Sequence, residues 1–186
     1  MQKRVFTAVL CLVLLVSGSA WGQDARITDF IVTNTRDDLI VYFKVQGSFS
    51  EKLEEAILKG VSTTFTFLVS LDRVRSFWKD KNLARLEIRH TVKYHNLKNE
   101  FVITRSEHKE EPIIVDTLDE AKRIMVEVEG LRIANLKTLE KNSRYQVSVK
   151  AELSKIILPF YLHHVFRFFL FLWDFETDWY TTDFIY

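Results

Sequence analysis

The stretch LARLEIRHTVKYHN, Leu83–Asn96, decides the fold class of this chain. Its side chains alternate with a period of two, as expected for a β-strand with one buried and one exposed face. One face carries Ala84, Leu86, Ile88, His90, Val92 and Tyr94, and the other carries Arg85, Glu87, Arg89, Thr91, Lys93 and His95. The polar HNLKNE that follows predicts a turn into FVITR, so this long strand forms a hairpin with the next one.

Other segments repeat the alternation on both sides of this hairpin. Two short strands are predicted within Ile27–Val45 around the turn TRDD, and a further strand within Ser62–Leu71, where Phe65, Phe67, Val69 and Leu71 share a face. The segment Leu136–Leu153 ends in a strand with Tyr145, Val147 and Val149 inward. Its leucine and tyrosine spacing resembles the corner that precedes a late strand in immunoglobulin-like sandwiches.

Two helices are predicted between the strands. Ser50 is a suitable N-cap for SEKLEEAILKG, which places Leu53, Ala56 and Ile57 on one face and ends at Gly60. Thr117 and Glu120 match a capping box, and the following helical spacing continues to Val128 and Gly130. We expect a mainly β fold, namely an immunoglobulin-like antiparallel β-sandwich with two additional short helices. The alternative is an α+β sheet with both helices on one face.

The first residues have the layout of a secretory signal peptide. Lys3 and Arg4 precede the apolar run Val5–Val16, and small residues follow it. The run is shorter than the roughly twenty residues that a membrane-spanning helix needs. We expect residues 1–22 to be removed, with a cut after Ala20 or Gly22, and residues 23–186 to form a single β-rich domain. The expected localisation is exported and periplasmic, with a possible peripheral contact with the membrane.

Composition narrows the chemistry of the exported domain. The only cysteine, Cys11, lies in the signal, so disulfides and thiol catalysis are excluded from the mature chain. Two of the 26 Lys and Arg residues also lie there, and the remainder nearly balance the 25 Asp and Glu residues, which argues against nucleic acid as a partner. The chain has no phosphate-binding glycine loop and no nucleophile elbow, so we predict no catalytic residue, no resident metal and no cofactor.

The acidic set Asp174, Glu176 and Asp178 is the first candidate site. In an extended segment the three carboxylates lie on one face, with Phe175, Thr177 and Trp179 opposite. Three like charges on one face favour a cation partner, such as calcium or basic side chains. A solvated strand face or salt bridges to residues such as Arg144 explain the same pattern. Trp173 and Trp179 flank the set and complete a candidate binding site.

A basic face is the second candidate. Arg85, Arg89 and Lys93 lie on the polar side of the long strand, after Arg73, Arg75, Lys79 and Lys81. Such a row suits an anionic partner, although Glu87 interrupts it and a solvated strand gives the same pattern. His90 lies on the apolar face and is interpreted as a hydrogen-bonded core histidine.

Residues 156–173 have about the length of a membrane span, but Pro159, His163, His164 and Arg167 interrupt it. Burial as a strand or in the core, and a helix lying flat on a bilayer, are both retained as readings. The final aromatic residues imitate the ending of outer-membrane barrel proteins, which we interpret as coincidence.

Segments along nearly the whole mature chain resemble one bacterial family. They are ITDFIVTNTRDDLIVYFKVQGSF, EEAILKGVSTTFTFLVSLDRVRSFW, KAELSKIILPFYL and WDFETDWYTTDFIY, and the family is Domain of Unknown Function 4390. The resemblance implies recurrence of Leu158 and Pro159 and of the Trp173 and Trp179 spacing, with a run between them that is not always apolar. This weakens the membrane-anchor interpretation. The family carries no established activity, so the resemblance assigns no role to any residue.

The sequence therefore predicts an exported, non-enzymatic binding or protein-interaction module of the bacterial envelope. Its expected partner is an envelope protein or a membrane surface. One alternative is a metal-dependent hydrolase or cation site built from Asp174, Glu176 and Asp178. Another is a carrier that holds an apolar ligand or lipid.

Overall fold

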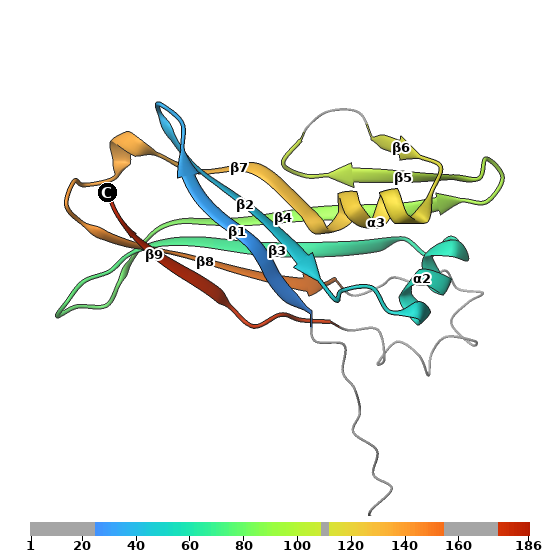
Figure 1. Ribbon diagram of the computed structural model, residues 1–186, viewed down its shortest axis with the longest axis horizontal. Coiled ribbons are helices and arrows are strands. Elements are labelled where there is room, and N and C mark those ends of the chain that lie inside the picture. The colour runs from blue at the N-terminus through green and yellow to red at the C-terminus, as the bar shows by residue number, and fades with distance from the viewer. Residues whose placement is uncertain (1–24, 109–111, 155–174) are drawn as a thin grey trace, which may run out of the picture.

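Two antiparallel sheets form the molecule in the computed structural model, which describes residues 25–108, 112–154 and 175–186 (Figure 1). The smaller sheet has the order β1 (Arg26–Asn34), β2 (Asp38–Gln46), β7 (Glu127–Asn135). The larger has the order β6 (Ile113–Val115), β5 (Glu100–Arg105), β4 (Lys81–His95), β3 (Thr63–Arg73), β8 (Arg144–Leu153), β9 (Tyr180–Ile185). The expected mainly β, sandwich-like fold with short helices is confirmed.

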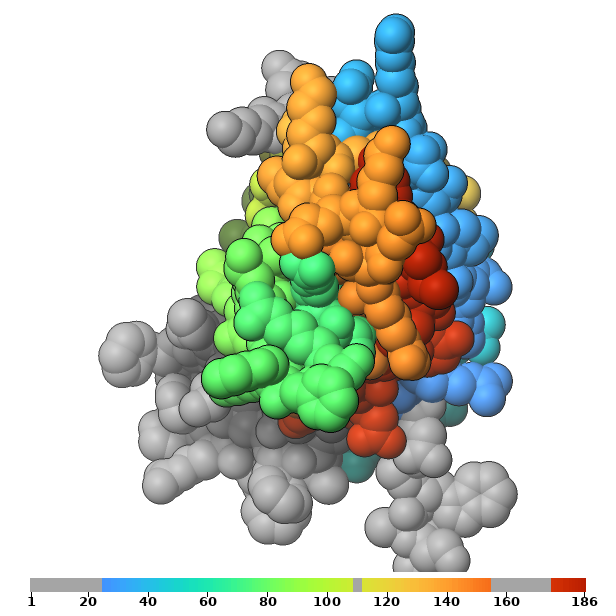
Figure 2. Space-filling model, turned by 90° about the vertical axis from the view of Figure 1, so that its left-hand side faces the viewer, coloured from blue at the N-terminus to red at the C-terminus, as the bar shows by residue number. Residues whose placement is uncertain are grey.

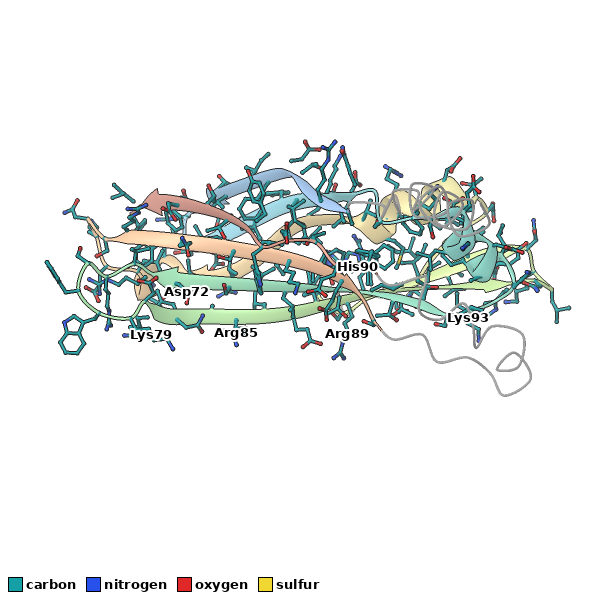
Figure 3. The ribbon with its side chains drawn as sticks, turned by 90° about the horizontal axis from the view of Figure 1, so that it is seen from below. Asp72, Lys79, Arg85, Arg89, His90 and Lys93 are labelled. Carbon is teal, nitrogen blue, oxygen red and sulfur yellow. The ribbon has the colours of Figure 1, made fainter. Side chains whose placement is uncertain are left out.

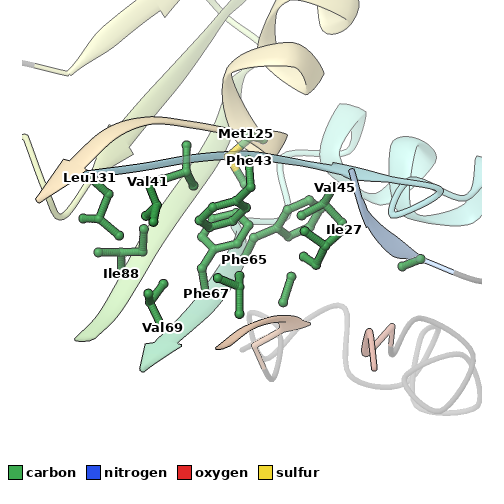
Figure 4. Close-up of a cluster of buried hydrophobic side chains, with 14 of the residues drawn as sticks. Ile27, Val41, Phe43, Val45, Phe65, Phe67, Val69, Ile88, Met125 and Leu131 are labelled. Carbon is green, nitrogen blue, oxygen red and sulfur yellow. The ribbon is translucent and has the colours of Figure 1, made fainter. Parts of the chain in front are cut away.

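The core lies between the two sheets. Phe43 of β2 meets Phe67 of β3 edge to face, with ring centroids 5.6 Å apart, and this contact joins the layers (Figure 4). The predicted inward residues of β3, Phe65, Phe67, Val69 and Leu71, are all fully buried. Alternation along each strand therefore places one face of the six-stranded sheet in the core and leaves the other outside.

The two helices begin where the capping residues predict. Ser50 accepts a hydrogen bond from the amide of Leu53 and caps α2 (Glu51–Leu58). Thr117 accepts one from the amide of Glu120 and caps α3 (Leu118–Val126). The α3 helix precedes β7 and contacts β4 and β5, so it extends the upper layer over the end of the large sheet (Figure 1).

The expected helix end at Gly130 is wrong. The α3 helix stops at Val126, and β7 begins at the next residue. Pairing with β2 overrides the local helical pattern here, because Val128 and Leu131 bury their side chains as strand residues opposite Phe43 and Val41. A register shift between these two pairs hides the strand period from the sequence. The short edge strand β6 was also not predicted.

The predicted corner before β8 is present. The Tyr145 hydroxyl accepts a hydrogen bond of 2.7 Å from the backbone amide of Glu140 and also lies 3.3 Å from the carbonyl oxygen of that residue. Tyr145 itself is fully buried, and Leu136 and Leu139 are buried next to it in sequence. The hydroxyl thus ties the β7–β8 connection, which includes the 3₁₀ turn η1 (Leu136–Thr138), to the start of β8.

Candidate functional site

The C-terminal segment adds an edge to the large sheet beside β8. Phe175 and Thr177 point inward and are buried, whereas Glu176 and Asp178 are exposed, as the period of two predicts. Backbone hydrogen bonds hold the segment in place, from Leu153 to Phe175 at 3.0 Å and from Thr177 to Ala151 at 2.9 Å. The described part of this ending is therefore extended, as the sharing of one face by Glu176 and Asp178 requires. Trp173 and Asp174 lie outside the described residues.

Glu176 itself is not a free carboxylate. Its carboxylate is ion-paired with the Lys150 ammonium, and the same ammonium lies 5.9 Å from the centroid of the Trp179 ring. The expected placement of Trp179 opposite Glu176 is therefore wrong, because both side chains reach one lysine of β8. The alternation breaks between Asp178 and Tyr180, after the isolated bridge of Glu176 to Glu152 and before β9 begins.

The acidic set gains little support as a metal site. Within residues 25–108, 112–154 and 175–186, no three His, Cys, Asp or Glu side chains converge as metal ligands would. Asp178 lines an open groove of about 450 Å³ between the start of β1 and residues 176–180, facing Ala25 and Arg26. Arg26 also lines this groove, so a cationic side chain lies near Asp178, while Glu176 is ion-paired with Lys150.

The basic face is present as predicted. Arg85, Arg89 and Lys93 project from the outer side of β4, opposite to His90 (Figure 3). They lie four residues apart, which spaces them about 13 Å from one another along an extended strand. Arg89 is paired with Glu87, while Arg85 and Lys93 have no ion-pair partner among the described residues.

Several carboxylates of the same sheet are bonded to neighbouring side chains. Asp72 accepts a hydrogen bond of 2.9 Å from Asn82, and Asp183 pairs with Arg144. Hydrogen bonds from Arg144 and then from Gln146 lower the pKa of Asp183 from its ordinary value. With Glu176 paired to Lys150, the charges of this face that have no ion-pair partner among the described residues include Arg85 and Lys93 of β4 and the Glu152 carboxylate of β8.

A polar groove of about 540 Å³ opens beside Arg89. Threonine and serine hydroxyls from β3 and the end of β8 line it, together with Glu87 and Glu152. Thr64, one of the lining residues, shares a hydrogen bond of 2.8 Å with Thr91 of β4. The groove offers hydroxyls and charged groups to a polar partner next to the basic row.

A buried histidine and glutamate lie behind this face. His90 is fully buried; its Nδ1 lies 3.1 Å from the carbonyl oxygen of Met125, and its Nε2 lies 2.6 Å from the Glu107 carboxylate. The carbonyl can only accept, so Nδ1 carries a proton. The interpretation of His90 as a hydrogen-bonded core histidine agrees with these contacts. Glu107 follows β5, and its side chain is only 9% exposed because it reaches back to His90.

The pKa of Glu107 reflects this contact. Burial alone raises it, but the hydrogen bond and charge of His90 outweigh burial and hold the pKa below its ordinary value. The second carboxylate oxygen of Glu107 is buried and has no hydrogen-bond partner among the described residues. Since the histidine ring is closed to solvent, the pair serves the core and does not form a substrate site.

Comparison with family models now places the chain. Residues 22–183 match the model described as Domain of unknown function (DUF4390). The chain belongs to this family. The resemblance in the sequence is thereby confirmed, and the match runs from before β1 into β9. No curated protein and no solved structure matches the chain. Among the described residues, no helix is long and apolar enough to cross a membrane.

One exposed feature was missed by the sequence reasoning. Phe77 and Trp78 lie at the tip of the β3–β4 connection. Among the described residues, no other two consecutive aromatic residues are as exposed to solvent. The signal was available, because FW stands between two predicted strands among Arg75, Lys79 and Lys81. Only the cations of this stretch were singled out as candidates.

Proposed function

We propose that the protein is an exported, non-enzymatic interaction module of the bacterial envelope. The outer face of its six-stranded sheet contacts an acidic partner through Arg85, Arg89 and Lys93. The observation that supports this most directly is the charge pattern of that face. Two of the three cations lack a counter-ion among the described residues, whereas Asp72, Glu176 and Asp183 are bonded to neighbouring side chains.

Physical reasoning favours binding over catalysis at this face. Exposed cations on a strand contribute little to stability, since surface ion pairs are typically worth 0–1 kcal/mol, so they are free to serve recognition. A complementary acidic surface would be steered towards them at low ionic strength and would dissociate as salt screens the charges. The hydroxyl groove beside Arg89 adds donors and acceptors that fix the orientation of a partner.

Export rests on the N-terminal residues, which lie outside the described part of the chain. The layout of residues 1–22 supports a cleaved signal. Cell fractionation with mass measurement of the periplasmic protein tests this, and we expect a chain that begins after Ala20 or Gly22. A cytoplasmic, uncleaved protein would contradict it.

The two alternatives have less support. A hydrolase or cation site needs converging carboxylates, but Glu176 is occupied by Lys150. A carrier needs an apolar cavity. Between the two sheets of the described residues, however, the Phe67 ring contacts the rings of Phe43 and His90. A rise in the melting temperature of the wild-type protein at millimolar calcium would support the alternative of a hydrolase or cation site.

The test of the proposed face is a pull-down of the tagged protein from its native envelope at low salt. We expect a partner that is released by salt and lost with the double variant Arg85→Glu/Lys93→Glu. A matched control, Arg36→Glu/Lys137→Glu, makes the same change in net charge at exposed positions in the β1–β2 turn and in η1. Equal loss with both variants, or no loss with the first, would contradict the assignment of this face.

A further inference from the structure

The β3–β4 connection, residues 74–80, projects beyond both sheets at one end of the molecule (Figure 1). Figure 2 looks onto this end, with the connection in green in front of the sheets and the β7–β8 connection in orange beside it. At its tip Phe77 is 94% exposed and Trp78 is 79% exposed. Single exposed apolar residues are common, but two adjacent rings at a projecting tip form a concentrated apolar point.

Hydrogen bonds build the base of this tip. The amide of Arg75 donates to the Asp80 carboxylate at 3.0 Å, and the amide of Val74 donates to the carbonyl of Arg144 at 2.9 Å. Arg73 is ion-paired with Glu140. The hairpin is thus anchored to the β7–β8 connection at its base while its two rings stay in solvent.

The charge around the rings is positive. Residues 74–81 contain Arg75, Lys79 and Lys81 against a single carboxylate, Asp80, so the tip carries a net charge of +2. None of the three cations has an ion-pair partner among the described residues, since the ion pairs at this end involve Arg73 and Arg144. A hollow of about 670 Å³ separates the rings from Asn142 and Ser143, and Arg75 contributes to its wall.

We propose that this tip docks on the surface of an anionic phospholipid bilayer. Phe77 and Trp78 enter the interfacial layer, and Arg75, Lys79 and Lys81 contact the headgroup phosphates. Tryptophan suits this layer because its ring is apolar while its N–H remains hydrogen-bonded. Basic residues next to the membrane are attracted to anionic headgroups, and each strengthens binding roughly fivefold at low salt.

Shape and charge favour a bilayer over a protein as the occupant. The rings stand on a convex hairpin tip, so a protein partner would have to provide a pocket shaped for both of them. A headgroup layer adapts to a convex insert, and its phosphates complement the cations on either side of the rings. The inference concerns a different surface from the β4 row and does not depend on the proposed acidic partner.

A local probe tests the proposal in the full chain. In a Cys11→Ser background, Ser76→Cys carries the environment-sensitive fluorophore NBD beside the two rings. Phosphatidylcholine vesicles containing phosphatidylglycerol should raise its emission several-fold, and pure phosphatidylcholine should raise it much less. The increase should weaken with salt and disappear in the additional variant Phe77→Ser/Trp78→Ser.

The opposite hairpin supplies the matched control. Leu97, in the β4–β5 turn, is as exposed as the tip rings, so Lys98→Cys places the same fluorophore beside an apolar residue at the other end of β4. We expect no increase there. The proposal is overturned by no increase at position 76, by equal increases at both positions, or by an increase that survives the loss of both rings.

Two further measurements are controls for the fluorescence increase at position 76. Circular dichroism of Phe77→Ser/Trp78→Ser should match the wild type, because neither ring contributes to the core. Arg85→Glu/Lys93→Glu should leave the increase at position 76 within about twofold, because these side chains lie farther from the bilayer than the tip cations and salt screens their charges. Failure of the β4 partner and failure of the membrane tip therefore give different results.

Discussion

The inner and outer faces of the six-stranded sheet are built by the same strands but carry different chemistry. On β4, Ile88, His90 and Val92 are buried against the other layer, while Arg85, Arg89 and Lys93 are exposed on alternate positions. The inner face gains its free energy from removing apolar surface from water. Because the outer face contributes little to that free energy, its cations are not explained by folding. Function should therefore be sought on the outer face.

The substitution with the largest expected effect on the free energy of unfolding is on the inner face of the sheet. Phe67→Ala removes a fully buried ring that contacts both Phe43 and His90. The cavity and lost burial should lower the free energy of unfolding by about 3–5 kcal/mol. Denaturant unfolding measures this. Ile185→Ala, on the outer side of β9 where the residue is largely exposed, should change it by less than about 0.5 kcal/mol. Equal losses would remove the distinction between the faces.

The C-terminal segment allows a second test of the difference between the two faces. We expect its residue Thr177 to contribute to the inner face. The buried Thr177 hydroxyl accepts a hydrogen bond of 2.9 Å from the backbone amide of Ala151. Thr177→Val keeps the shape and leaves that amide without its acceptor, which should cost about 1–3 kcal/mol. Thr181→Val, whose hydroxyl bonds Ser148 on the exposed side, should cost less than half as much. A neutral Thr177→Val would place the segment outside the folded core.

Acidification should reveal the contribution of the Glu107 carboxylate, which lies against His90. The pKa of Glu107 in the folded protein is below its ordinary value of 4.5. Its carboxylate therefore stabilises the fold fully above the unfolded pKa, and this contribution is lost as the pH falls through the folded pKa. Below about pH 4.5 the unfolding free energy of the wild type should fall more steeply than that of Glu107→Gln. Parallel pH profiles would show that the His90 contact contributes nothing.

The smallest expected effect on stability is on the basic row. Arg85→Glu/Lys93→Glu should change the unfolding free energy by no more than about 0.5 kcal/mol, because both side chains are exposed and unpaired among the described residues. Thermal unfolding with and without salt measures this. A loss of several kcal/mol would show that the outer face is structural after all.

The sequence identified this two-faced sheet through short-range patterns. The alternation of β4, the Ser50 and Thr117 caps and the Tyr145 corner all depend on residues close together in the chain. Contacts between distant residues were not predictable in the same way. Trp179 turns towards Lys150, and Glu107 is buried by His90 from the preceding strand of the sheet. The strand β7 was not predicted, because a continuous helical pattern precedes it and a bulge interrupts the period-two alternation of its side chains.

Site-specific photo-crosslinking in the native envelope tests the central claim most directly. Glu87→benzoylphenylalanine places the reactive group within the basic row and keeps its three cations, and Thr33→benzoylphenylalanine places it on the exposed side of β1 as a control. We expect a discrete adduct from position 87 that is lost with Arg85→Glu/Lys93→Glu, and none from position 33. No adduct from position 87, or the same adduct from both positions, would contradict the assignment of the outer face as the interaction surface.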